Sequence, residues 1–172
     1  MLAVYIICGI ILLVALLAFT VTTVFENKAE IVIDKPKAEV FEFLKSLKNQ
    51  RKWKVWDQLD PNMKQEFTGI DSTVGFIEAW DGNKKAGKGA QEIKKIKEGE
   101  RIDIEMRFEK PFKLTNGVYF ATSSIETNKT NVVFCLYGNS PRPFNLLFPF
   151  MKASMIKDLN RGLLNLKEVL EK

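Results

Sequence analysis

The chain has 172 residues, of which 27% are charged and 46% are hydrophobic, and this length suits one domain with a core rather than two. The net charge of +5 comes from 26 Lys and Arg residues interspersed among 21 Asp and Glu residues, which argues against a nucleic-acid-binding stripe. The absence of histidine excludes Ser-His-Asp hydrolysis, Cys-His proteolysis and HExxH zinc chemistry.

Residues 2–25, LAVYIICGIILLVALLAFTVTTVF, carry no charged side chain. At about 1.5 Å per residue this run makes a helix of roughly 36 Å, which exceeds the hydrocarbon core of about 30 Å. We therefore predict a transmembrane anchor over residues 1–26. The alternative is a cleaved signal peptide, but no Lys or Arg precedes the run, the run is long, and no A-x-A site follows.

The membrane orientation is predicted from the basic residues that flank this segment. No basic side chain precedes it, whereas four lysines follow within the next 20 residues. The positive-inside rule then places the rest of the chain on the cytoplasmic side of a single-pass membrane protein. The four lysines are Lys28, Lys35, Lys37 and Lys45.

A strand and a helix are predicted next. Residues 28–35 alternate in the manner of a half-buried strand, close behind the apolar segment. Residues 34–50 have the pattern of a helix, with Asp34 as a possible cap and Pro36 in the first turn. The buried stripe of this helix is predicted to contain Val40, Phe41, Leu44 and Leu47.

The stretch KNQRKWKVW, residues 48–56, is the most basic part of the chain. Lysines beside tryptophans are typical of proteins that bind single-stranded nucleic acid. The interpretation we favour is a solvated helix end followed by buried tryptophan. We expect no nucleic-acid partner.

Six strands in sequential hairpins are predicted from period-two alternation and recurring turn residues. The clearest is 101–108, in which Ile102 and Ile104 face one side and Asp103 and Glu105 face the other. The six segments are 64–70, 72–80, 87–99, 100–108, 117–127 and 130–139.

A long amphipathic helix is predicted after Pro149. Gly162 lies inside it, where glycine costs about 1 kcal/mol relative to alanine, so a close approach to the sheet is expected there. The apolar stripe contains Met151, Met155, Leu159, Leu163, Leu166 and Leu170.

The glycines of WDGNKKAGKG, residues 80–89, lie beside lysines, as in phosphate-binding loops. A P-loop, however, has the form G-x-x-x-x-G-K-[ST] and opens a helix. Here strand alternation resumes at Ala90, so we interpret these glycines as a hairpin turn and a bend in the following strand.

This order of elements is that of the helix-grip fold, an α+β arrangement in which a curved antiparallel sheet wraps a long C-terminal helix. The segment from Ala29 to Glu171 resembles the SRPBCC superfamily, in its START-like, polyketide cyclase/dehydrase-like branch. The stretches that carry the resemblance are IDKPKAEVFEFL, Trp53 and Trp56 before Asp60-Pro61, VGFIEAWDGNKKAGKG, Phe108 with Pro111, and DLNRGLLNLKEVLE.

The resemblance implies a START-like domain over residues 27–172 with a hydrophobic cavity for a lipid-like or polyketide-like molecule. The superfamily includes lipid-transfer proteins and aromatase/cyclases and has no universal catalytic residue, so the fold does not settle the function. This chain has Phe134 where many relatives have tryptophan, and the superfamily does not require a membrane span.

Candidate residues for the cavity wall are mostly aromatic, because ligand pockets are mainly apolar with a few polar groups. For each of them the alternative is ordinary core packing. Methionines could form an adaptable part of the wall. The candidates are Trp53, Trp56, Phe76, Glu78, Trp80, Phe108, Phe120, Phe134, Met151 and Met155.

Glu78 shares a strand face with Phe76 and Trp80 by parity. If this face points inward, burial raises the pKa of Glu78, which could then act as an acid, a base or a ligand anchor. If the face points outward, Glu78 is solvated. The same choice between an inward and an outward orientation applies to Glu92 and Tyr119. Asp57 is predicted to be a helix cap or a turn residue.

Three functions remain open at this point. The first is membrane-anchored binding of a hydrophobic small molecule or lipid, with no cofactor and no metal. The second is a cyclase/dehydratase-type enzyme that uses Glu78 or Tyr119. The third is an interaction module whose cavity is collapsed.

Residues 141–155, PRPFNLLFPFMKASM, could be a gate, a membrane-contacting lip or simply a packed helix start.

Overall fold

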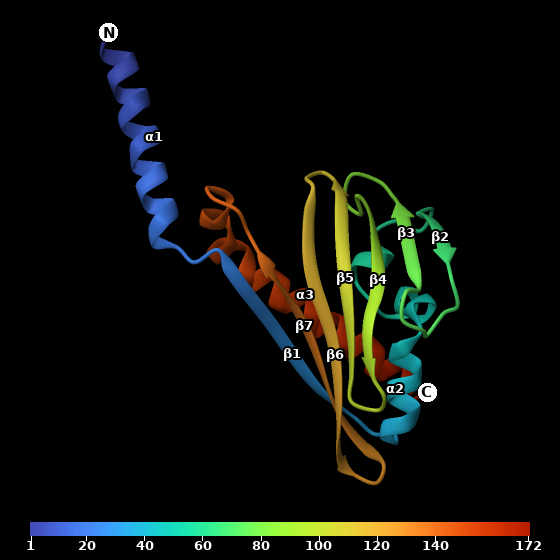
Figure 1. The fold of residues 1–172 in the computed structure, drawn as a ribbon. Coiled ribbons are helices and arrows are strands. Elements are labelled where there is room, and N and C mark those ends of the chain that lie inside the picture. Colours follow the sequence, from blue (N-terminus) through green and yellow to red (C-terminus); the bar gives the residue numbers. More distant parts are fainter.

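The computed structural model describes residues 1–172 and begins with an isolated helix, α1 (Leu2–Thr20), which projects away from the rest of the molecule (Figure 1). This helix is long and apolar enough to cross a membrane, and of its residues only Ala18 is buried. The helix is shorter than the apolar run of the sequence. The chain becomes extended at Val21, and Phe25 is buried as part of the first strand.

The sheet contains seven antiparallel strands in the order β1-β7-β6-β5-β4-β3-β2. Strands β2 to β7 form a meander, and β1 joins the sheet beside β7. The predicted order of a strand, a helical segment, six strands and a long helix is confirmed. The strands are β1 (Val24–Ile33), β2 (Lys64–Thr68), β3 (Ile77–Asp81), β4 (Lys88–Lys97), β5 (Arg101–Lys110), β6 (Leu114–Glu126) and β7 (Lys129–Asn139).

Helix α3 (Phe148–Leu170) runs across one face of this sheet (Figure 1). Its buried side chains are those of its C-terminal half, and α2 (Lys37–Lys45) buries Val40, Phe41 and Leu44 against the same core. This is the helix-grip arrangement, and the fold prediction is confirmed. The buried leucines of α3 are Leu159, Leu163, Leu166 and Leu170.

The segment after α2 is not the continuous helix that the sequence predicts. Ser46 is extended, and the chain continues as a 3₁₀ helix, η1 (Leu47–Lys52). The carboxylate of Asp71 accepts hydrogen bonds from the Ser46 hydroxyl at 2.5 Å and from the Leu47 N–H at 3.0 Å. This distant carboxylate therefore provides the interactions that interrupt the helix.

The predicted cap at Asp34 is also wrong. Pro36 occupies the cap position of α2, and no side chain caps the helix. The N–H of Asp34 instead donates to the carboxylate of Glu171 at 2.6 Å, which connects the end of β1 to the end of α3.

The connection between β3 and β4 is a hairpin turn, as predicted. The Gly82 N–H donates to the Gly87 carbonyl at 2.9 Å, and the Gly87 N–H donates to the Asn83 carbonyl at 2.8 Å. Gly87 has a φ of +69°, which suits glycine. At Gly89, a Cβ atom would clash with the Arg107 carbonyl oxygen and the Trp80 ring, so glycine is required there by packing rather than by a phosphate.

The close approach predicted at Gly162 is an ordinary contact. A Cβ atom built on Gly162 would lie 3.6 Å from the Trp53 ring and 3.9 Å from the Phe134 ring. The helix therefore has room for an alanine at this position.

We expect Gly162→Ala to stabilise the protein by up to about 1 kcal/mol, because alanine is the better helix former and its methyl group fits. We expect Gly89→Ala to destabilise it by about 1–3 kcal/mol, because the clash involves backbone. Urea unfolding of both full-length variants in the same detergent measures the difference. A loss of stability in Gly162→Ala would contradict the observed spacing.

Candidate functional site

A cavity of about 560 Å³ lies between the N-terminal half of α3 and the sheet. Its wall is built from β3 to β7, α3, the segment after η1, and the connections that follow β3 and β5. Fifteen of its 26 lining residues are hydrophobic, so the wall is mainly apolar with polar groups at defined places. Both the volume and this composition are typical of small-molecule sites.

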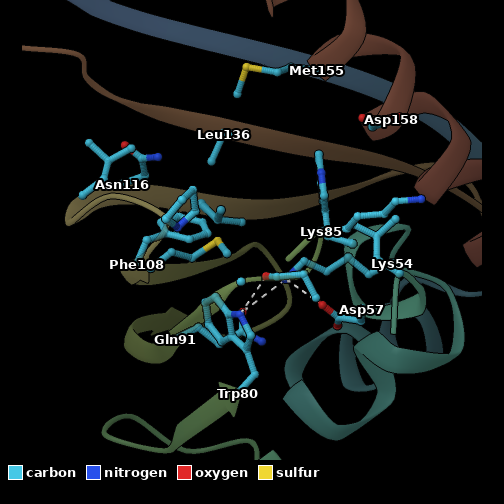
Figure 2. Close-up of a pocket in the computed structure, with 18 of the residues that line it drawn as sticks. Lys54, Asp57, Trp80, Lys85, Gln91, Phe108, Asn116, Leu136, Met155 and Asp158 are labelled. Atoms are coloured by element: carbon cyan, nitrogen blue, oxygen red, sulfur yellow. Dashed lines mark hydrogen bonds and ion pairs between the residues drawn. The ribbon is translucent and has the colours of Figure 1, made fainter. Parts of the chain in front are cut away.

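Figure 2 shows how the wall is arranged, with Met155 of α3 across the cavity from Trp80 and Gln91. Phe108 and Trp80 pack edge to face with ring centroids 5.6 Å apart. Of the ten ligand-binding candidates, seven line this cavity: Trp56, Glu78, Trp80, Phe108, Phe134, Met151 and Met155.

The other three candidates are not among the lining residues. Trp53, Phe76 and Phe120 are fully buried in the packed core. Trp53 packs edge to face on Phe120, with ring centroids 5.6 Å apart. These three aromatic side chains therefore belong to the packed core rather than to the cavity wall.

Glu78 points inward and is only 2% exposed. Its two carboxylate oxygens each accept one short hydrogen bond from an amide. The Gln65 Nε2 donates to Oε1, and the Gln91 Nε2 donates to Oε2, both at 2.6 Å. Gln91 lies directly opposite Glu78 across the β3–β4 pair, so the sheet register sets this contact.

A buried lysine belongs to the same polar cluster. Lys54 is 2% exposed, and its ammonium donates to the side-chain oxygens of Gln50 at 2.8 Å and Gln91 at 3.3 Å. The Asp57 carboxylate lies 3.9 Å from the same ammonium. Because isolated buried charges are unfavourable, the opposite charges and the shared amides stabilise one another.

Burial raises the pKa of Glu78 from 4.5 to about 6, and the nearby charge of Asp57 acts in the same direction. Lys54 and the amide donors Gln91 and Gln65 oppose this rise. Desolvation is the largest effect, so Glu78 changes its charge near neutral pH while in contact with the cavity.

Two further candidates lie on the other face of the sheet. The Tyr119 ring lies under the Arg101 guanidinium at 3.7 Å, and its hydroxyl is 3.5 Å from the Glu26 carboxylate. Glu92 accepts a hydrogen bond from Arg107 at 2.8 Å, which lowers the pKa of its carboxyl group. The structure does not bring either residue together with Glu78.

Sequence reasoning missed several polar residues of the cavity. Gln91 has the same strand parity as the buried Ile93, and Asn116 has the parity of Val118, so alternation could have placed both inside. Lys54 gave no such signal, because it lies in the most basic stretch of the chain, which we interpreted as a solvated helix end. Asp57 is in the cavity wall rather than serving only in a turn.

No group of three or more His, Cys, Asp or Glu side chains is placed to hold a metal ion. Cys8 and Cys135 are both free thiols. The chemistry that the site offers is therefore that of one carboxyl group, one ammonium and several amides around an apolar volume.

The similarity of this chain to known proteins lies in its structure. No protein-family model matches it, and no curated protein matches it in sequence. Norcoclaurine synthase from Thalictrum flavum, solved with dopamine and hydroxybenzaldehyde, has a TM-score of 0.64 at 11% identity, with 88% of this chain and 90% of that chain covered.

Two other solved structures have the same arrangement. The Aha1 dimer from Colwellia psychrerythraea has a TM-score of 0.58 at 18% identity, with 86% of this chain and 96% of that chain covered. DynU16, from the dynemicin biosynthetic locus, has a TM-score of 0.57 at 14% identity, with 86% of this chain and 47% of that chain covered. The chain thus shares the helix-grip fold of these structures, and at these identities the similarity shows the fold alone.

The raised pKa of Glu78 predicts a specific pH dependence of stability. The folded state binds this proton more tightly than the unfolded state, so stability falls as the pH rises from 4.5 through about 6, by about 2 kcal/mol. We expect Glu78→Gln to lack this component in urea unfolding between pH 4 and pH 8.

Glu92→Gln is the matched control, because Glu92 lies opposite Ile77 on the adjacent strand but has a lowered pKa. The Glu92 carboxyl group contributes to stability with the opposite pH dependence, and this contribution is lost as the pH falls. If Glu78→Gln and the wild type showed the same pH profile, Glu78 would not titrate as described.

Proposed function

We propose that this protein binds a hydrophobic or lipid-like small molecule inside the helix-grip cavity while α1 anchors it in a membrane. The observation that carries the proposal is the apolar cavity of about 560 Å³ under the N-terminal half of α3. This volume argues against the third alternative, an interaction module whose cavity is collapsed.

The polar cluster suggests which kind of molecule fits. Asp57 has a buried carboxylate oxygen, Oδ2, without a hydrogen-bond partner, and Asp57 and Glu78 both line the cavity. Buried unpaired acceptors are unfavourable, and the Asp57 side chain as a whole is 13% exposed, so a turn of its carboxylate toward the cavity would let a hydroxyl or another donor on the ligand satisfy this oxygen. We therefore favour an amphipathic ligand with an apolar body and a donor group directed toward Asp57.

The membrane part of the proposal depends on α1. Nearly all of its side chains are exposed and apolar, which suits contact with lipid tails but not with water. A signal sequence shares these features, so retention of α1 is part of the proposal. The lysines that follow it favour a single-pass protein with the domain on the cytoplasmic side.

We expect native mass spectrometry of the full-length protein, extracted from membranes in mild detergent, to show a bound small molecule that lipid analysis can identify. In Val118→Trp the bound fraction should fall several-fold, because Val118 is a buried residue of the cavity wall and tryptophan would fill the space. The measurement is the ratio of loaded to empty protein.

Val133→Trp is the matched control, because Val133 lies on the adjacent strand β7 and faces away from the core. Equal loading of the two variants would argue against the cavity as the binding site. Empty wild-type protein in repeated preparations would contradict the proposed function.

A second candidate function is catalysis by Glu78. It is favoured by one observation, a buried carboxyl group in the wall of a mainly apolar cavity with a pKa raised to about 6, which is suitable for acid–base chemistry near neutral pH. Such an activity would be of the cyclase/dehydratase type, with Glu78 as acid or base. Tyr119 lies on the opposite face of the sheet and could not assist it directly.

The two candidates differ in the behaviour of Glu78→Gln. If Glu78 is catalytic, the variant should keep its ligand and lose conversion of that ligand, as followed by mass spectrometry after incubation of the co-purified molecule. If the ligand is unchanged by the wild type and is retained by the variant, binding alone describes the site.

A further inference from the structure

Four large apolar side chains at one end of the domain are exposed to solvent. Phe112 is 70% exposed, Phe144 54%, Leu147 57% and Phe150 84%. They come from two segments, the β5–β6 connection and the chain around the start of α3, and the rings of Phe112 and Phe144 lie 6.2 Å apart. We call these four residues the rim. A cluster of this kind on a soluble surface marks an interaction site.

The rim is joined to the end of α1 through side chains of its own segment. The Asn145 Nδ2 donates to the carbonyl oxygens of Ala18 and Val21, both at 2.8 Å, and the Arg142 Nε donates to Ala18 O at 3.0 Å. Ala18 and Asn145 are both buried. These contacts satisfy carbonyls that the end of a helix leaves free, and they fix the direction in which α1 leaves the domain.

This geometry directs α1 and the rim toward the same side of the molecule. In Figure 1, α1 extends away from the end of the domain that carries the start of α3 and the β5–β6 connection, whereas the β6–β7 turn lies at the opposite end. A bilayer crossed by α1 would therefore meet the rim and not the β6–β7 turn.

Basic side chains lie at the same edge of the cavity as the rim, since Lys85 and Lys110 line it together with Phe112 and Phe150. Lys84 and Lys85 in the β3–β4 connection, and Lys110 and Lys113 beside Phe112, are exposed, and none of them forms an ion pair within the protein. Aromatic side chains combined with free lysines are the pattern of protein segments that lie at the surface of an anionic membrane.

The rim is also the edge of the cavity. Phe112 and Phe150 line it, as do Lys85 and Lys110. We propose that the rim inserts into the interface of the bilayer that α1 spans, so that the cavity opens toward lipid rather than toward water. This inference rests on the proposed membrane anchorage, and it adds a second, specific contact with the same membrane.

The test uses the full-length chain with Cys8→Ser, reconstituted in vesicles of phosphatidylcholine and phosphatidylglycerol. Cys135 is fully buried, so a single introduced cysteine can be labelled with an environment-sensitive fluorophore. Labels at Phe150→Cys, Ile125→Cys and Ile11→Cys report on the rim, the far end of the domain and the middle of α1. Lipids with a spin label near the headgroup or deep in the acyl chain quench the fluorophore according to its depth.

Ile125 is the matched control, because it is a large apolar residue that is 53% exposed and lies near the β6–β7 turn. We expect the label at residue 150 to be quenched several-fold more than the label at residue 125 by the headgroup quencher, and the label at residue 11 to be quenched by the deep one. If residue 11 is quenched while residues 150 and 125 behave alike, the rim does not contact the membrane and the inference is wrong.

If residue 11 is not quenched, the membrane anchorage itself fails and the inference fails with it. Neither result depends on a bound ligand, so ligand binding by the cavity is judged separately by mass spectrometry.

Discussion

The insertion of the Trp53 side chain between α3 and the sheet determines how the interior of this domain is divided. The indole ring is fully buried and packs edge to face on Phe120 and Phe134 at 5.6 and 5.7 Å, and Gly162 of α3 lies against it. The Asn165 amide donates to the Trp53 carbonyl at 3.0 Å, which joins the same residue to the helix. Trp53 belongs to the closely packed core, and two of its neighbours, Lys54 in the chain and Phe134 in space, line the cavity.

The position of Trp53 also brings the polar cluster to the cavity wall. The next residue, Lys54, is buried by the same turn of chain, and its ammonium meets Gln50 and Gln91. Gln91 then donates to Glu78, so a lysine from the helical segment and a glutamate from the sheet share one partner. The cavity thus combines an apolar volume with a network of charged and amide groups. The place of Lys54 in this network follows from the burial of the adjacent Trp53. The apolar rim lies at the end of this cavity from which α1 departs, and this arrangement is the geometric basis of the proposed contact with a membrane.

The fold could be predicted from the sequence because its signals are local. Alternation in β4 to β7, the stripe of α3 and the glycines between β3 and β4 each depend on near neighbours, and all of them are as expected. The errors arose where a distant residue decides the conformation, as when Asp71 ends α2 early or Glu171 binds the Asp34 N–H. For the site, four of the seven aromatic candidates line the cavity and three belong to the packed core, and parity could not show which face of β3 points inward. Lys54 was missed because its burial depends on the position of Trp53, which charge patterning does not reveal.

The most direct test of ligand binding uses the methionine methyl groups. The chain has five methionines, of which Met63, Met106, Met151 and Met155 line the cavity and Met1 precedes α1. In ¹³C-methyl NMR of the full-length protein in detergent micelles, stripped of co-purifying molecules and then titrated with 1-oleoylglycerol, whose hydroxyl groups supply the donors that the site favours, the account predicts saturable shifts of the four cavity methyl groups and none of Met1. If the four cavity signals did not move, or moved only in parallel with Met1, the account of the cavity as a binding site would be contradicted.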